Sequence, residues 1–226
     1  MPANFSIDFL LRNDAPTSSA QSSPSTIKVS LDGRGLWKRF HELGTEMIVT
    51  KSGRRMFPTL QIGINGLNRD DSYSIMVDLE PMDAKRYRYS FHQSRWTATG
   101  PGEAELPCRT FVHPESPSPG SHWMRNAVSF DKLKLTNNQL DDNGHIIVNS
   151  MHRYRPRVHI VNHGDSNRRE TFTFRETTFI AVTAYQNHRI TSLKIESNPF
   201  AKGFRECEVW LPAMQLLVWL LNGRTS

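Results

Sequence analysis

Residues 145–163, "HIIVNSMHRYRPRVHIVNH", indicate the fold class because they hold two short runs that are typical of strands. HIIVNS and RVHIVNH are rich in β-branched residues, and neither is long enough for an ordinary helix. Similar runs occur on both sides, namely EMIVTK, TLQIGING, YSIMVDLE, RYRYSFH and TFTFRETTFIAV. Turn-forming pairs such as Ser52-Gly53 and Asn143-Gly144 separate them. Short strands at this spacing, without a helix after each one, predict a mostly β protein with an antiparallel sandwich or barrel.

Two segments depart from the strand pattern. In GRGLWKRFHELG the apolar residues lie on one face of a short amphipathic helix, which we expect between Gly35 and Gly44. In YQNHRITSLKIESN the apolar residues fit a helix and a strand about equally. We favour a helix there, because Asn187 can cap its start and Pro199 can stop it.

Length and composition fit one large domain with tails. The chain has 226 residues, of which 37% are hydrophobic and 10% aromatic, enough for a packed core. We expect a disordered N-terminal segment at residues 1–26, one domain at 27–206 and a short tail at 207–226. Residues 27–206 contain 26 Lys and Arg against 19 Asp and Glu, a net charge of +7. A basic folded domain favours a polyanion as its partner.

Several classes of protein find no support in the sequence. The two cysteines, Cys108 and Cys207, cannot make a disulfide framework, and they favour a reducing compartment. The first residues lack the basic region of a secretory signal, and the apolar run at 211–221 is too short to span a membrane. No pattern of metal ligands, phosphate-binding glycines or an activated nucleophile is present. We therefore expect no enzyme, no metal, no cofactor and no membrane association.

The string TKSGRRMFP holds a candidate base-reading arginine. Arg54 and Arg55 follow a glycine turn and precede the apolar residues Met56 and Phe57. Arginine can form a forked pair of hydrogen bonds with guanine in the major groove. An arginine held by a tight turn over an apolar anchor would be aimed in advance at a base edge. Two solvated loop arginines are the alternative.

Two further strings place cations on one face of a strand. In FDKLKLTNN, Lys132 and Lys134 alternate with leucines, and in RYRPRVHIV the alternating cations are Arg153, Arg155 and Arg157. Such faces suit phosphates, yet a solvated strand face would have the same pattern. The sequence leaves both interpretations open.

The string SNPFAKGFRE combines aromatic and basic residues near the end of the predicted domain. Pro199 can open a new helical turn, on which Phe200 and Phe204 would share one face. Lys202 and Arg205 lie beside them. The pair of aromatics could fill the core or form a wedge against a flat, apolar and negatively charged partner.

Long strings of the chain closely resemble the T-box family of transcription factors. They are LWKRF, TEMIVTKSGRRMFP, LTNNQLDDNGHIIVNSMHRYRPRVHIV and TAYQNHRITSLKIESNPFAKGFR, in family order from about Leu36 to Arg205. AYQNHRITSLKI and FRECE are similar to the T-box-one branch, and other strings to neighbouring branches. The resemblance implies an immunoglobulin-type antiparallel β-sandwich or barrel, with a short N-terminal helix and C-terminal helices that contact DNA. It also implies a nuclear protein that binds double-stranded DNA at a T-type half-site.

The resemblance carries roles onto particular residues. Arg54 would contact guanine in the major groove, while Phe200 and Phe204 would enter the minor groove, flanked by Lys202 and Arg205 on the phosphate side. The complete set of expected DNA contacts is Arg54, Arg55, Lys132, Lys134, Thr183, Tyr185, Gln186, Asn187, Lys194, Asn198, Pro199, Phe200, Lys202, Phe204 and Arg205.

The N-terminus holds a candidate docking peptide. FSIDFLL resembles the engrailed-homology motif that binds Groucho-type corepressors, and Phe5, Ser6, Ile7, Leu10 and Leu11 would form it. A stray hydrophobic start is the alternative. We expect a transcriptional repressor in developmental cell-fate control, with a homodimer on paired sites as a further candidate. The competing hypothesis is a β-sandwich interaction or scaffold module that binds no DNA, because a fold alone does not decide function.

Overall fold

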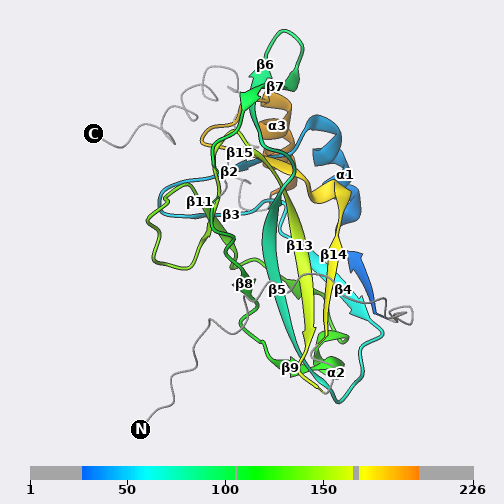
Figure 1. Ribbon diagram of the computed structural model, residues 1–226. Coiled ribbons are helices and arrows are strands. Elements are labelled where there is room, and N and C mark those ends of the chain that lie inside the picture. The colour runs from blue at the N-terminus through cyan, green and yellow to red at the C-terminus, as the bar shows by residue number, and fades with distance from the viewer. Residues whose placement is uncertain (1–26, 105, 165–167, 199–226) are drawn as a thin grey trace, which may run out of the picture.

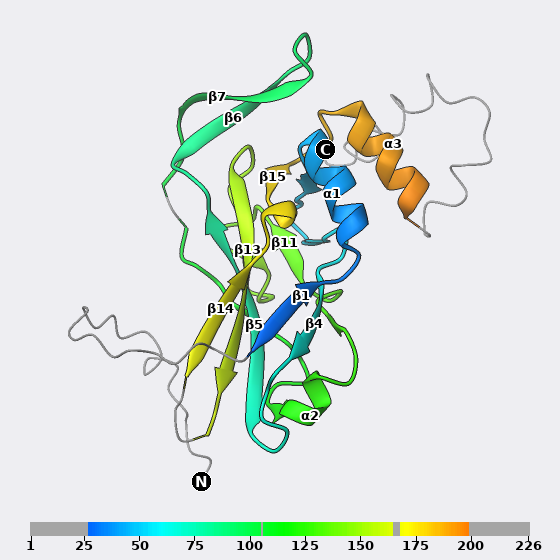
Figure 2. The same ribbon diagram turned by 90° about the vertical axis from the view of Figure 1, so that its right-hand side faces the viewer.

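The computed structural model describes residues 27–104, 106–164 and 168–198 (Figure 1). Strands dominate, and the few helices gather at the two ends of the molecule (Figures 1 and 2). In chain order the elements are β1 (Lys28–Leu31), α1 (Arg34–Leu43), β2 (Glu46–Ile48), β3 (Arg54–Arg55), β4 (Gln61–Asn65), β5 (Ser72–Pro81), β6 (Lys85–Ser90), β7 (Arg95–Pro101), β8 (Phe111–Val112), β9 (Ser118–Pro119), α2 (Gly120–Trp123), β10 (Val128–Ser129), β11 (Lys134–Thr136), β12 (Ile146–Ile147), β13 (Arg153–Asn162), β14 (Arg169–Thr173), the 3₁₀ helix η2 (Arg175–Thr177), β15 (Phe179–Val182) and α3 (His188–Ser197).

The largest sheet has the strand order β2-β15-β13-β5-β8, with β14 added to β13 and β9 to β5. Its centre is the long antiparallel pair β5 and β13, in register from Pro81↔Tyr154 to Tyr73↔Asn162. A second sheet, β1-β4-β10, lies across from it, as Figure 2 shows. This arrangement is the predicted immunoglobulin-type β-sandwich. The described strand pairs are antiparallel except for β2 with β15 and β11 with β12, which are parallel, and an isolated bridge between Thr50 and Thr136 is parallel as well.

A continuous apolar core fills the space between the sheets. Alternate residues of β4, such as Ile62 and Ile64, face the interior side chains of β5 and β13, such as Ile75 and Ile160, and all four are almost fully buried. Alternation with period two is what a strand with one buried face requires. A smaller cluster of Phe40, Ile190 and Leu193 joins α1 to α3 at one end of the sandwich.

Both predicted helices are present. The first ends at Gly44, as expected, but it begins after Gly33 and not at Gly35, because Gly33 takes the left-handed conformation (φ 61°) that starts the turn. The second is α3, and its cap is confirmed, since Asn187 Oδ1 accepts a hydrogen bond of 3.0 Å from the amide of Arg189.

Three expectations lie outside the described residues. They are the disordered segment at 1–26 with its docking peptide, the aromatic and basic turn at 199–205, and the tail at 207–226. Within the described part of the chain, no helix is both long and apolar enough to cross a membrane.

Candidate nucleic-acid interface

Three cations meet on the short sheet β12-β11-β3. The antiparallel register of β3 and β11 places Arg55 directly opposite Lys134, and Arg54 opposite Leu135. Arg54 and Arg55 are exposed and Lys134 is partly exposed. Among the described residues, no carboxylate forms an ion pair with any of the three. This edge therefore carries uncompensated positive charge. Like charges directly opposite each other destabilise a strand pair, so the arrangement is unfavourable in the free protein.

The turn before Arg54 is tightly constrained. Gly53 donates its amide to the carbonyl oxygen of Thr50 at 3.1 Å and has a φ of 81°. A Cβ at this position would lie 2.8 Å from the ring of His145, so a side chain here would clash. The hydroxyl of Thr136 donates to the carbonyl oxygen of Thr50 at 2.9 Å, which ties the turn to β11. The backbone that carries Arg54 is therefore held in place on two sides.

A buried carboxylate supports the loop that touches this turn. Asp141 accepts hydrogen bonds from the His145 amide (3.0 Å) and the Arg109 guanidinium (2.9 Å), and its Oδ1 lies 2.8 Å from Nδ1 of His145. These bonds fix the His145 ring that packs against Gly53. The network thus supports the arginine turn through the His145 ring, which packs against Gly53.

Apolar residues anchor the other side of the arginine pair, as the sequence predicts. Met56 is buried in the main core. Phe57 packs edge-on against Phe40 of α1, with 5.9 Å between ring centroids, and belongs to the cluster that also holds Ile190 of α3. The turn and its anchor are observed, whereas the guanine contact of Arg54 stays a prediction.

The segment 183–187, between β15 and α3, lies close to the arginine pair. Thr183 is exposed, and Tyr185 and Gln186 are partly exposed. Burial raises the pKa of Tyr185, and the positive charge of Arg54 opposes that rise. Tyr185 and Phe57, which follows the arginine pair, pack against the same apolar cluster of Phe40, Ile190 and Leu193, so segment 183–187 lies near the arginine turn.

Asn187, one of the expected DNA contacts, lies inside the fold, and its contact with DNA stays a prediction. Its side chain is buried, with Oδ1 capping α3 and Nδ2 donating to the carbonyl oxygen of Leu43 at 2.9 Å. Both polar atoms of the amide are therefore used inside the fold. The capping geometry that makes Asn187 a good start for α3 also removes it from the surface.

Lys194 is a second expected contact that lies inside the fold, and its contact with DNA likewise stays a prediction. It was expected at the DNA surface, but its side chain is buried, and Nζ donates to the backbone carbonyl oxygen of Glu46 at 3.0 Å. The ammonium lies 4.7 Å from the ring centroid of Tyr185. Burial lowers the pKa of Lys194 to about 7, against the opposing pull of Glu46. The physical reason is the rotation of α3, which turns Ile190, Leu193 and Lys194 toward the interior together.

Asn198 marks the end of the described chain. Its amide donates to the carbonyl oxygen of Lys194 at 2.8 Å, which closes the last turn of α3. The remaining expected contacts, Pro199, Phe200, Lys202, Phe204 and Arg205, lie outside the described residues.

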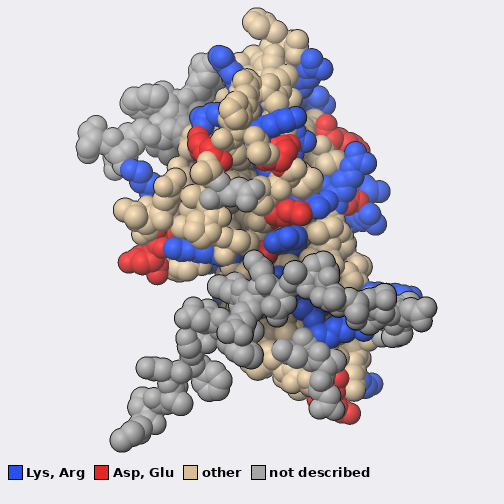
Figure 3. Space-filling view, viewed as in Figure 1, with Lys and Arg blue, Asp and Glu red and all other residues tan. Residues whose placement is uncertain are grey.

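The second predicted cationic face, on β13, is paired with acids. Arg155 lies 2.5 Å from Glu80, and Arg157 lies 2.8 Å from Asp78, both on the neighbouring strand β5. Arg153 stacks on the ring of Tyr87 and lies 3.8 Å from Asp83. Figure 3 shows acidic side chains interspersed among basic ones over the upper half of this side of the molecule. The face therefore carries little excess charge.

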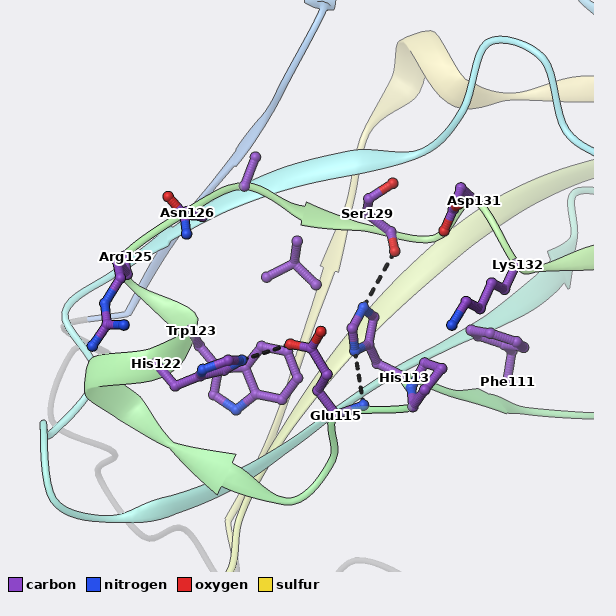
Figure 4. A pocket seen from close by; sticks show the side chains of 13 residues that line it. Phe111, His113, Glu115, His122, Trp123, Arg125, Asn126, Ser129, Asp131 and Lys132 are labelled. Atoms are coloured by element: carbon purple, nitrogen blue, oxygen red, sulfur yellow. Dashed lines mark hydrogen bonds and ion pairs between the residues drawn. The ribbon is translucent and has the colours of Figure 1, made fainter.

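Lys132 is exposed, precedes β11 by two residues, and lies at the edge of a cleft of about 410 Å³. Figure 4 shows His113 in this cleft, with its Nδ1 accepting from the Glu115 amide at 3.3 Å and Nε2 3.2 Å from the carbonyl oxygen of Ser129. Burial lowers the pKa of His113, in agreement with a neutral ring that donates through Nε2. The cleft also involves α2, at the end of the molecule opposite α3 (Figures 1 and 2), so it is separate from the arginine turn.

Sequence reasoning missed one residue at the centre of the interface. Glu46 is fully buried in β2, and its carboxylate accepts hydrogen bonds from the amides of Gln186 and Asn187 at 2.8 and 3.0 Å. The only sequence signal is a lone acid at the start of the apolar run EMIV. A glutamate at the first position of a strand is usually solvated, so its sequence position alone does not indicate these partners. They lie far away in the sequence and meet Glu46 only in the folded protein.

Comparisons with known proteins agree with the strings quoted above. A family model described as T-box matches residues 29–206. The chain is 67% identical over 213 residues to the T-box transcription factor mls-1 of Caenorhabditis elegans, covering 92% of this chain and 84% of that protein. It is 56% identical over 193 residues to TBX1 of Danio rerio and 55% identical over 204 residues to TBX10 of Homo sapiens, covering 81% and 86% of this chain. The chain spans 42% of that TBX1 and 53% of that TBX10.

Proposed function

Because the chain belongs to the T-box family of transcription factors, we propose that it binds double-stranded DNA at a T-type half-site and regulates transcription in the nucleus. T-box proteins are DNA-binding regulators of transcription and not enzymes. The observation that carries the proposal is the β3–β11 edge, where Arg55 and Lys134 lie opposite each other. No carboxylate of the described residues forms an ion pair with either of them. A polyanion relieves that repulsion and releases counterions when it binds.

In this proposal Arg54 enters the major groove and reads a guanine, because its backbone is fixed by the Gly53 turn and by Phe57. Arg55 and Lys134 contact phosphates on either side of that base. Thr183 and Gln186 add contacts to the DNA backbone, since Tyr185 of the same segment packs with Phe57 of the arginine turn in one apolar cluster. Hydroxyl and amide groups are common phosphate ligands.

The segment 199–205 enters the minor groove in the same proposal. It follows α3 directly, and α3 is anchored beside the arginine turn through Ile190 and Leu193. Phe200 and Phe204 act as apolar wedges, and Lys202 and Arg205 meet the flanking phosphates. Wedges of this kind widen or bend the groove, and the cations offset the cost of desolvation.

The finer regulatory role is repression in developmental cell-fate control. The motif FSIDFLL at residues 5–11 supports it, because a Groucho-type corepressor would bind such a peptide without disturbing the domain. A peptide of residues 1–14, mixed with a purified Groucho-type WD domain, tests this part separately. Absence of binding would exclude a Groucho-type corepressor as a partner of this peptide. Homodimerisation is a separate proposal, and a duplex with paired half-sites tests it.

The test of DNA binding is a titration of the 226-residue protein with a duplex carrying a T half-site and with a scrambled duplex, at several salt concentrations. We expect tighter binding to the half-site and a steep fall in affinity with salt for both duplexes. A scaffold module would bind neither duplex with sequence preference, nor show a steep salt slope. That outcome would favour the competing hypothesis of an interaction module.

A further inference from the structure

Glu46 connects segment 183–187 to the β6–β7 hairpin through one buried carboxylate. Oε2 accepts a hydrogen bond of 2.8 Å from the Gln186 amide. Oε1 accepts 3.0 Å from the Asn187 amide and 3.2 Å from Nε1 of Trp96, on the β6–β7 hairpin. The side chain is completely buried, so Glu46 cannot touch DNA itself.

The backbone of the same residue holds helix α3. Lys194 Nζ donates to the Glu46 carbonyl oxygen at 3.0 Å, and β2 lies in parallel register with β15, with Glu46 opposite Ile180. Segment 183–187 leaves β15 and enters α3, so both of its ends are tied to this one strand. A shift of Glu46 would move the start of α3 and the segment before it together.

Placing a carboxylate here is costly, which argues for a specific role. Burial raises the pKa of Glu46 to about 7, although the hydrogen bonds from Gln186, Asn187 and Trp96 and the charge of Lys194 oppose that rise. An apolar residue would fill a buried strand position with less penalty. The donors that converge on Glu46 include the two backbone amides at the start of α3, which a carboxylate can accept at the same time.

We propose that Glu46 is a positioning residue for DNA binding: its carboxylate holds the Gln186 and Asn187 backbone so that segment 183–187 is presented beside Arg54. The inference rests on the proposed function, because it names what organises the same interface. Segment 183–187 then has its binding conformation before DNA arrives, and less ordering is required on association.

The test compares Glu46→Gln with wild type in the full chain. Glutamine has the same size but only one acceptor oxygen, and its NH₂ group would face an amide donor. Two measurements are made: affinity for the T half-site duplex at a temperature where each protein is folded, and hydrogen exchange of individual amides in the free protein. A second variant, Trp96→Phe, removes one donor from the carboxylate and keeps an aromatic ring.

A remote core variant controls for general destabilisation. Ile160 is buried in β13, and Ile160→Val or Ile160→Ala is chosen to match the melting temperature of Glu46→Gln. We expect Glu46→Gln to bind the half-site about tenfold more weakly and Trp96→Phe about threefold more weakly. The matched control should bind like wild type. Exchange at the Gln186 and Asn187 amides should accelerate in Glu46→Gln relative to amides of β5 and β13.

Three outcomes separate the possibilities. If Glu46→Gln binds the half-site as well as wild type, or loses no more affinity than the matched control, the positioning role is overturned and Glu46 only stabilises the fold. Unchanged exchange at Gln186 and Asn187 would overturn it as well. If wild type shows no preference for the half-site, the proposed function fails. In that case, faster exchange at these two amides in Glu46→Gln would still show that the Glu46 carboxylate restrains segment 183–187.

Discussion

Strands β11 and β13 both carry cations at alternate positions, but the structure gives them opposite electrostatic surroundings. On β13, the antiparallel register with β5 places Arg155 opposite Glu80 and Arg157 opposite Asp78. On β11, the register with β3 places Lys134 opposite Arg55. Periodicity decides which face of a strand a cation occupies, whereas the neighbouring strand decides whether its charge is compensated.

The two regions also differ in what the cations contribute. The β13 arginines pack over acids that are themselves partly or fully buried, so they stabilise the sheet at its centre. Of the β3–β11 cations, Arg54 and Arg55 are exposed and Lys134 is partly exposed, and removing one of the opposed pair Arg55 and Lys134 relieves repulsion in the free protein. Substitutions on β13 should therefore affect folding, and substitutions on β3 and β11 should affect DNA binding.

The largest expected effect is on folding, at Asp78. Asp78 is buried between Arg157, at 2.8 Å, and His159, at 3.0 Å. Asp78→Asn leaves the Arg157 guanidinium without its counterion, and we expect a loss of about 3 kcal/mol in the free energy of unfolding. Chemical denaturation measures it. Half-site affinity, measured below the melting temperature, should stay at the wild-type level, and a large drop there would contradict the division between the two regions.

The pH dependence of stability sharpens the same point. Burial opposes ionisation of Asp78, but the His159 ring 3.0 Å away and the hydrogen bonds from Arg157 outweigh it and hold the pKa of the carboxyl well below its usual range. The folded state therefore binds the proton less readily than the unfolded state. The resulting stability is present above about pH 4 and is lost as pH falls toward the folded pKa, by up to about 1.4 kcal/mol per pH unit.

Asp78→Asn lacks this dependence. Urea denaturation of both proteins between pH 5 and pH 2 should show their stabilities converging as pH falls. A constant difference across that range would mean that ionisation of Asp78 contributes nothing to the fold.

The next effect is on sequence recognition, at Arg54. Arg54→Ala removes the predicted forked contact with guanine, so half-site affinity should fall by about 1–3 kcal/mol while affinity for scrambled DNA changes much less. The matched control is Arg69→Ala, an exposed arginine beside α2 at the other end of the molecule. Equal losses on both duplexes would make Arg54 a phosphate contact.

The smallest effect is expected at Lys134. Lys134→Ala should weaken binding to half-site and scrambled DNA alike and lower the salt slope by about one unit, because one phosphate contact is lost. It should leave stability unchanged or slightly higher, since the repulsion with Arg55 disappears.

Lys132→Ala, at the cleft, is the informative companion to Lys134→Ala. The sequence predicts the same slope change for it. An unchanged slope for Lys132→Ala would place Lys132 away from the phosphate backbone.

Much of the fold was accessible from local patterns. Period-two alternation in YSIMVDLE and RVHIVNH predicts the two central strands, and Gly44 and Asn187 mark the end of one helix and the start of the other, because these signals act over a few residues. The candidate interface was accessible only in part. Arg54 with its turn and apolar anchor is local, but the burial of Asn187 and Lys194 depends on the strand and helices against which α3 packs.

By itself, the sequence determined the class of fold, the family and the arginine turn, since strand period, turn residues and long family strings are all written along the chain. Only the tertiary structure decided which cations are free. The acids that neutralise Arg155 and Arg157 lie more than seventy residues away in the chain, and the amides that meet Glu46 lie 140 and 141 residues away. Charge compensation depends on distance in space, and that distance is set by strand register and by packing between remote segments.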